Sequence, residues 1–167
     1  MHHRHVGLRC TKDLREGQFI DTYRGEIITN EEADRREEQA AKGKASYLYS
    51  LDKHVHQNGL KQEDCYVIDG EFMGGPTRFI NHSCEPNCRQ YTVSYNKNDQ
   101  RIYELAFFAY VNIPAGTELT FDYLDKDEDV EEVGGDDVPS TQGTYGDDKS
   151  VMRCQCGSKK CRGKLWM

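Results

Sequence analysis

Three cysteines near the end of the chain constrain the fold more than any other feature of the sequence. Cys154 and Cys156 are separated by one residue, and Cys161 follows five residues later. Thiolates at this spacing suit one tetrahedral Zn²⁺, and three of them leave one coordination position for a cysteine from elsewhere in the chain. On spacing alone, Cys84 and Cys88 are both candidates for the fourth ligand. The pattern predicts a structural zinc site that fastens the closing segment to the body of the domain.

The bulk properties fit one domain in a reducing compartment. The chain has 167 residues, enough for a single core, and we expect no transmembrane helix because no apolar stretch approaches 18 residues. The start of the chain has no apolar signal-peptide core, so the seven cysteines are better read as metal ligands or core residues than as disulfides. Residues 125–149 carry a charge of −8 against −7 for the whole chain, which leaves +1 on the rest.

Short strand patterns separated by turns indicate an α+β, mostly β domain. Thr29 followed by Glu32 fits a capping box, which predicts a short charged helix over 33–42 that ends at Gly43. The segment 25–28 extends the strand before it or pairs with that strand. We divide the chain into a body over 1–124, an acidic flexible linker over 125–149 and a zinc-binding tail over 150–167. Strands are expected over 18–23, 25–28, 45–52, 65–69, 101–113 and 118–123.

Two further segments concentrate polar and aromatic groups. Arg78, Asn81 and His82 are crowded around the apolar pair Phe79 and Ile80. Alternation along the strand expected over 118–123 places Leu119, Phe121 and Tyr123 on one face. Buried tyrosines need partners for their hydroxyls, so these aromatics fit either an aromatic channel with hydroxyls inside or ordinary core packing.

Taken in order, the motifs resemble those of the SET-domain protein lysine methyltransferases. RFINHSCEPN over 78–87 is similar to the knot-like segment of that family, and ELTFDY over 118–123 to its active-site strand. The unit CQCG…CRG over 154–163 is similar to the post-SET zinc motif. The amino-acid sequences of these motifs most resemble those of the fungal heterochromatin-type enzymes that methylate lysine 9 of histone H3. The resemblance implies a fold of several small sheets with a knot-like segment and a zinc-bound tail.

The resemblance also implies a role for individual side chains. S-adenosylmethionine is expected in an open pocket, and the substrate lysine in a narrow channel that enters from the opposite face. Gly7 matches the second glycine of a family Gly-Trp-Gly motif that wraps the cofactor. The implied catalytic residues are Tyr123, Tyr23 and Phe121; the cofactor contacts are Gly7, Tyr47, Arg78, Phe79, Asn81, His82 and Trp166; Asp52 contacts substrate; and the zinc ligands are Cys84, Cys154, Cys156 and Cys161.

The expected activity is methyl transfer from S-adenosylmethionine to lysine 9 of histone H3. In this family, members with tyrosine at the position of Phe121 tend to stop at a lower methylation state. Phe121 therefore implies a dimethyl or trimethyl product. The expected partners are the histone H3 tail or another lysine-containing peptide and chromatin proteins, in the nucleus, without sequence-specific nucleic acid binding. Two alternatives stay open at this point: methylation of a different lysine, and a catalytically weak SET module that binds protein.

Overall fold

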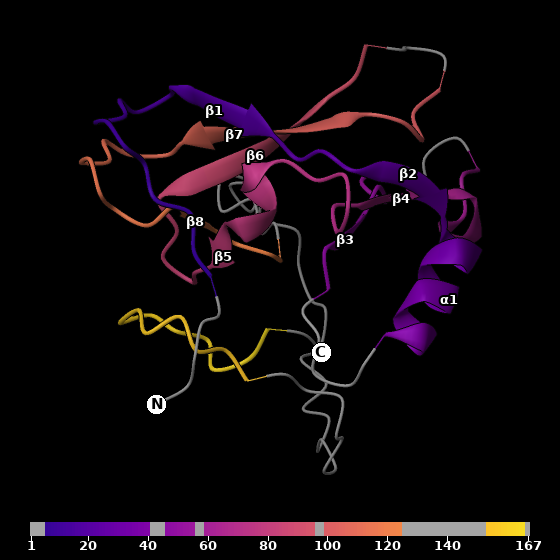
Figure 1. Cartoon of the computed structure of the whole chain (residues 1–167). Helices are drawn as coiled ribbons and strands as arrows, with labels where there is room; N and C mark the ends of the chain where they lie inside the picture. The colour runs from indigo at the N-terminus through magenta and orange to yellow at the C-terminus, as the bar shows by residue number, and fades with distance from the viewer. Residues whose placement is uncertain (1–5, 41–45, 56–58, 96–98, 125–152, 166–167) are drawn as a thin grey trace, which may run out of the picture.

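Three small sheets and one α-helix make up the part of the chain that the structure describes (Figure 1). The computed structural model describes residues 6–40, 46–55, 59–95, 99–124 and 153–165. The first sheet is antiparallel, in the order β1 (Phe19–Thr22), β7 (Glu104–Ala109), β6 (Cys88–Val93). The second is antiparallel, in the order β2 (Glu26–Thr29), β4 (Tyr66–Asp69), β3 (Leu48–Ser50). The third pairs β5 (Asn81–His82) in parallel with β8 (Thr120–Phe121).

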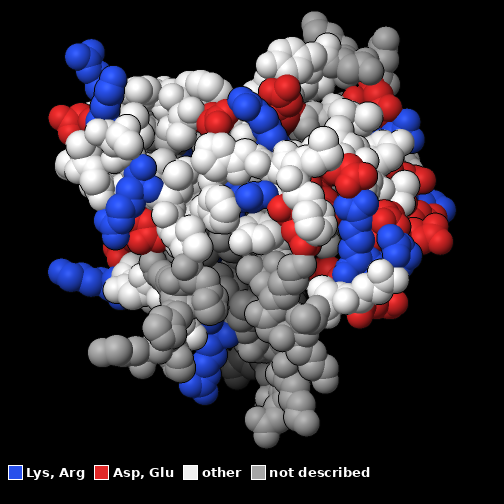
Figure 2. Space-filling view, in the orientation of Figure 1, with Lys and Arg blue, Asp and Glu red and all other residues white. Residues whose placement is uncertain are grey.

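Helix α1 (Asn30–Gln39) lies against the second sheet, at the right in Figure 1. The Thr29 hydroxyl accepts from the Glu32 amide at 3.2 Å, which confirms Thr29 as the N-cap. Arg36 reaches from the helix to Asp69 on β4 at 2.6 Å and to Glu26 on β2 at 2.9 Å. Figure 2 shows acidic and basic side chains side by side over this helix. Ala33 is the one buried residue of α1, so the helix has no apolar stripe. Ion pairs attach it to the second sheet.

The core lies between the first and third sheets. Phe107 and Leu105 on β7 point inward, and Ile80 and Ile113 pack with them at 1% exposure. The 3₁₀ turns η1 (Gln62–Asp64) and η2 (Pro76–Phe79) complete the described elements. Ile80 follows η2 directly, so its burial anchors the start of β5 in the core. Among the described residues, no helix is long and apolar enough to cross a membrane.

Several sequence-based boundaries were wrong. The helix begins at Asn30, because residues next to an N-cap already belong to the first turn, and it ends at Gln39, before Gly43. The pattern over 25–28 forms β2, which pairs with β4 and not with β1. The strands expected over 45–52, 101–113 and 118–123 are shortened to β3, β7 and β8, because a ladder ends where its partner strand ends.

Strand β6 was missed altogether. It pairs with β7 along its full length, from Cys88 opposite Ala109 to Val93 opposite Glu104. Its sequence, CRQYTV, mixes polar and apolar residues and gives little alternation to detect. The pairing with an apolar neighbour therefore decides its conformation. The expected linker over 125–149 lies outside the described residues.

Candidate functional site

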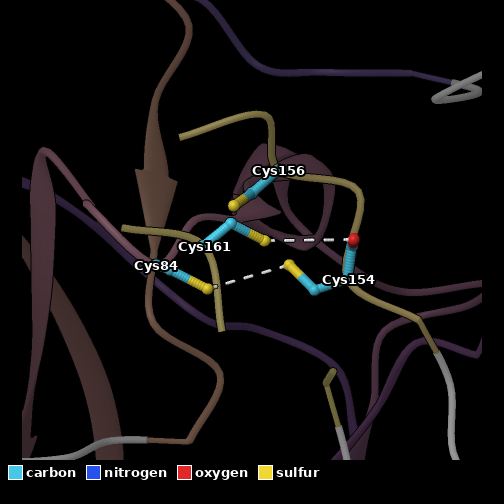
Figure 3. Close-up of side chains that lie close together, drawn as sticks. All are labelled: Cys84, Cys154, Cys156 and Cys161. Carbon is cyan, nitrogen blue, oxygen red and sulfur yellow. Dashed lines mark hydrogen bonds between the residues drawn. The ribbon is translucent and has the colours of Figure 1, made fainter. Parts of the chain in front are cut away.

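Four cysteine sulfurs converge where the tail meets the body (Figure 3). Cys84 follows β5, and Cys154, Cys156 and Cys161 come from the tail, with all four sulfurs within 4.8 Å of one another. The Cys84 and Cys154 sulfurs lie 3.8 Å apart. Zn–S bonds of about 2.3 Å in a tetrahedron place sulfurs about 3.8 Å apart, so the cluster fits zinc binding. The alternative ligand, Cys88, is instead 1% exposed in β6 and donates to Asn87.

Hydrogen bonds prepare these sulfurs to serve as ligands. The Arg162 amide donates to Cys84 and the Gly163 amide donates to Cys161, each at 3.4 Å. Burial, together with the neighbouring cysteines, raises the pKa of the Cys154 thiol to about 12. Metal binding therefore has to displace protons, and zinc affinity should increase with pH.

A charged pair fastens the tail beside the third sheet. The Arg162 guanidinium donates twice to the Asp122 carboxylate, with both distances 2.6 Å. Burial alone would raise the pKa of Asp122, but the hydrogen bonds from Arg162 and the Leu124 amide hold it below its ordinary value. In Figure 1 the tail lies below β5 and β8, in keeping with these contacts. We call this bidentate pair the tail clamp.

His82 joins the cysteine cluster to Tyr123. Its Nδ1 accepts from the Tyr123 amide at 3.2 Å, and its Nε2 lies 3.2 Å from the Cys84 sulfur. Because Nδ1 is an acceptor, the neutral ring carries its proton on Nε2, which faces that sulfur. His82 is 6% exposed, so this bridge is held inside the molecule.

Two tyrosines each donate their hydroxyl proton to a main-chain carbonyl. Tyr123 donates to Ile80 at 3.0 Å, and Tyr23 donates to Tyr47 at 2.7 Å. Burial, and then the proximity of Tyr123, raises the pKa of Tyr23 well above its usual range. The Tyr23 phenol is therefore neutral at physiological pH. Each hydroxyl oxygen, of Tyr23 and of Tyr123, keeps lone pairs that accept hydrogen bonds.

Phe121 forms the floor beside Tyr123. The two ring centroids lie 4.7 Å apart, and Phe107 packs edge-on to Phe121 at 5.0 Å. Phe121 is 5% exposed and Leu119 is 2% exposed, so the alternation expected over this strand is confirmed. Phe107, Phe121 and Tyr123 thus form one contiguous group of aromatic rings.

The predicted cofactor residues lie around the N-terminal segment and η2. The Leu8 amide donates to Phe79 at 3.1 Å, which seats Gly7 beside the start of β5. The Asn81 amide nitrogen donates to Val6 at 3.0 Å and to Glu118 at 2.8 Å. These contacts bring Gly7, Phe79 and Asn81 together.

Arg78 is clasped between aromatic rings and main-chain carbonyls. Its guanidinium lies over the Phe79 ring at 4.7 Å and over the Tyr47 ring at 5.5 Å. It also donates to the carbonyls of Gly70 and Glu71. Its Nε is buried without a hydrogen-bond partner among the described residues. A buried donor of this kind fits a site that is completed by a ligand.

Two predicted residues are not joined to this network. Asp52 lies in the exposed turn after β3, where its carbonyl accepts from Val55. Trp166 lies outside the described residues. Sequence reasoning also missed Glu118, Asp122 and Arg162. The signal was available, because all three stand inside the motifs of the expected active-site strand and zinc tail.

The family model that matches the chain is that of the SET domain, over residues 5–124. The chain belongs to the SET-domain family. The histone-lysine N-methyltransferase KMT1 of Fusarium mangiferae, specific for lysine 9 of histone H3, is 45% identical over 96% of this chain. The corresponding enzyme dim-5 of Neurospora crassa is 43% identical over the same share. This SET chain covers 45% and 47% of those two relatives, less than half of their length.

Solved structures confirm the SET fold. One, described as the structural basis for the product specificity of histone lysine methyltransferases, has a TM-score of 0.71 and 42% identity. The alignment with that structure covers 96% of this chain and 52% of the solved chain. The Neurospora SET-domain protein DIM-5 has a TM-score of 0.64 and 46% identity, over 72% of this chain and 48% of that one. SET methyltransferases use S-adenosylmethionine, the cofactor expected from the sequence.

Proposed function

We propose that this protein transfers methyl groups from S-adenosylmethionine to a protein lysine, and that the lysine is lysine 9 of histone H3. The observation that carries the proposal is the pair formed by the buried Tyr23 and the partly buried Tyr123, whose hydroxyl oxygens are left as acceptors. A lysine amine carries donors that such oxygens can orient. Similarity to two H3 lysine 9 enzymes at 43% and 45% identity supports the choice of substrate.

The site offers what amine methylation needs. Methyl transfer from a sulfonium is an in-line displacement, so alignment is the main demand on the protein. Free lysine has a pKa near 10.4 and is charged at neutral pH. The apolar rings of Phe121 and Tyr123 disfavour the ammonium form, because burial penalises charge. Tyr123 would then orient the neutral amine so that the lone pair of its nitrogen points toward the methyl group.

The residues proposed to hold the cofactor are those around the N-terminal segment. Arg78 supplies a buried donor, Asn81 supplies an amide, and Gly7 lies close to Asn81 without a side chain of its own. When bound, S-adenosylmethionine would supply the electrophilic methyl. Tyr47, Phe79, His82 and Trp166 complete the proposed set. Zinc would be held by Cys84 and the three tail cysteines and would have a structural role, since four protein ligands leave no open position.

Finer aspects of the proposal concern product and partners. Phe121 lies beside Tyr123 and carries no hydroxyl, so it would leave room for a methylated nitrogen to rotate, and we propose dimethyl and trimethyl products. Asp52 is exposed and acidic, and we propose that it contacts a basic residue beside the target lysine. The partners would be the histone H3 tail and chromatin proteins, and the protein would act in the nucleus.

A peptide panel tests the substrate. The zinc-loaded protein is offered histone peptides that cover the known basic tails, each paired with a version whose target lysine is replaced by Arg. We expect methylation of the H3 amino-terminal peptide, loss of it on replacing lysine 9, and weaker peptide binding in Asp52→Asn. Methylation of a different peptide instead would keep the activity and overturn the substrate.

A further inference from the structure

Glu118 carries an inference that concerns a residue outside the predicted site. It precedes β8, and its carboxylate oxygen accepts from the Asn81 side-chain nitrogen at 2.8 Å. The same nitrogen donates to the Val6 carbonyl at 3.0 Å. A side-chain amide has two N–H groups and one oxygen. Both N–H groups of Asn81 are therefore engaged by protein acceptors, and its oxygen is directed elsewhere.

Hydrogen bonds fix the backbone that carries this carboxylate. The Asn87 side chain donates to the Glu118 carbonyl at 2.8 Å and accepts from the Thr120 amide at 2.8 Å, which fixes the backbone on both sides. Glu118 also forms a β-bridge with Arg9 in the N-terminal segment. An amide flip of Asn81 would place its oxygen against the Val6 carbonyl and the Glu118 carboxylate, which repel it.

Gly7 packs against the same carboxylate. A Cβ added at Gly7 would lie 2.7 Å from the nearer Glu118 carboxylate oxygen and 3.1 Å from the Asn81 nitrogen. The first contact is closer than atoms tolerate and the second is tight, so a side chain at position 7 would push the end of the Glu118 side chain away from Asn81. Gly7, Asn81 and Glu118 thus form one packed unit, which we call the amide lock.

We infer that Glu118 is a positioning residue that fixes Asn81 with its amide oxygen toward the cofactor, where it accepts from the ammonium of the amino-acid part of S-adenosylmethionine. The inference rests on the proposed function. Among the donors of that cofactor, the ammonium suits this oxygen best, because the negative charge of Glu118 behind the amide favours a cation in front of it.

Two nucleosides separate this role from a general effect on folding. S-adenosylhomocysteine carries the amino-acid ammonium, whereas 5′-methylthioadenosine shares the adenosine and thioether and lacks the amino acid. Calorimetric titration of the zinc-loaded protein with each ligand needs no turnover. Glu118→Ala removes the lock, Glu118→Gln keeps an acceptor oxygen, and Glu104→Ala changes an exposed glutamate on β7 as a matched control.

We expect Glu118→Ala to weaken S-adenosylhomocysteine binding about tenfold, the usual loss for a hydrogen bond to a charged group. Methylthioadenosine binding should change by less than about twofold, since its contacts do not involve the ammonium. Glu118→Gln keeps the acceptor oxygen and loses the charge, so its affinity for S-adenosylhomocysteine should fall between those of Glu118→Ala and the wild-type protein. Glu104→Ala should bind both ligands nearly as the wild-type protein does. Gly7→Ala should weaken S-adenosylhomocysteine binding, and much less so in the Glu118→Ala background, because both changes act on one contact.

The outcomes that overturn the inference differ from those that overturn the proposed function. Equal losses for the two ligands in Glu118→Ala would show a merely structural role, and no loss for either would show no role. Additive effects of Gly7→Ala and Glu118→Ala would also contradict the lock. A wild-type protein that binds neither nucleoside would contradict the methyltransferase assignment itself, and the inference with it.

Discussion

Single side chains set the chemistry of this SET domain. Tyr123 and Tyr23 keep their oxygens as acceptors because each proton is donated to a carbonyl, of Ile80 and Tyr47 respectively. Phe121, which is 5% exposed, packs against Tyr123 with the ring centroids 4.7 Å apart. The identity of the residue at 121 therefore decides how much space and how many hydrogen bonds surround the amine.

Phe121→Tyr tests this dependence. A new hydroxyl beside Tyr123 would hold the amine or a water and hinder rotation of a methylated nitrogen. We expect the monomethyl product to accumulate, with the rate of the first transfer reduced by less than about tenfold, because no existing hydrogen bond is lost. Mass spectrometry of a time course resolves the products. A trimethyl yield equal to that of the wild-type protein would contradict the role given to Phe121.

At the scale of elements, local sequence patterns predicted the motifs and the metal ligands. They missed strands whose position and length depend on pairing with a distant strand. The cysteine spacing left Cys84 and Cys88 as candidates for the fourth ligand, the resemblance named Cys84, and the cluster contains Cys84. Strand β6 and the ends of β7 depend on a partner strand distant in sequence, which local alternation does not contain. Glu118 and Arg162 stand inside recognised motifs, but the partners of their side chains, Asn81 and Asp122, lie far away in the sequence and follow only from the fold.

The tail clamp gives a prediction at this scale. Arg162→Ala removes both hydrogen bonds to Asp122 and leaves that partly buried carboxylate without its cation. We expect weaker zinc binding and faster proteolysis of the tail, with Arg162→Lys intermediate, because an ammonium cannot donate in the bidentate geometry. Zinc titration by a competing chelator and limited proteolysis measure the two effects. Arg89→Ala, on β6, serves as a matched control, and an equal effect there would argue against the clamp.

Helix α1 gives a pH prediction. Hydrogen bonds from Arg35 and Arg36 lower the pKa of Glu32 from an ordinary 4.5 to about 2. A carboxylate with a depressed folded pKa contributes stability above its unfolded pKa and loses it as the pH falls toward the folded value. The melting temperature of the wild-type protein should therefore exceed that of Glu32→Gln at pH 6, and the difference should shrink between pH 4.5 and 2. A difference that is constant across this range would contradict the ion-pair account.

For the whole molecule, the central relation is between the zinc cluster and the site. Cys84 lies between β5 and the tail, His82 connects it to Tyr123, and Asp122 stands next to that tyrosine. The tail is therefore fastened to the same short sheet that carries the proposed catalytic tyrosine. Zinc binding should order both at once.

Removal of zinc tests this coupling. Structural zinc supplies roughly 10–16 kcal/mol of apparent binding free energy in small peptides, so its loss should release the tail and lower the melting temperature. We also expect S-adenosylhomocysteine binding to weaken, because His82 and Tyr123 lose a fixed neighbour. Chelation followed by calorimetry and by a zinc add-back measures the effect. Full cofactor affinity in the zinc-free protein would contradict the coupling.

The most direct test of the account is methyl transfer from S-adenosylmethionine to a histone H3 amino-terminal peptide, followed by mass spectrometry. The account predicts transfer by the zinc-loaded wild-type protein and none to the peptide with lysine 9 replaced by Arg. It predicts a loss of about 10²-fold or more in Tyr123→Phe, as for removal of one group that acts in the transition state, while that variant still binds S-adenosylhomocysteine. Transfer at the wild-type rate by Tyr123→Phe, or no transfer by a folded, zinc-loaded protein to any lysine peptide, would contradict it.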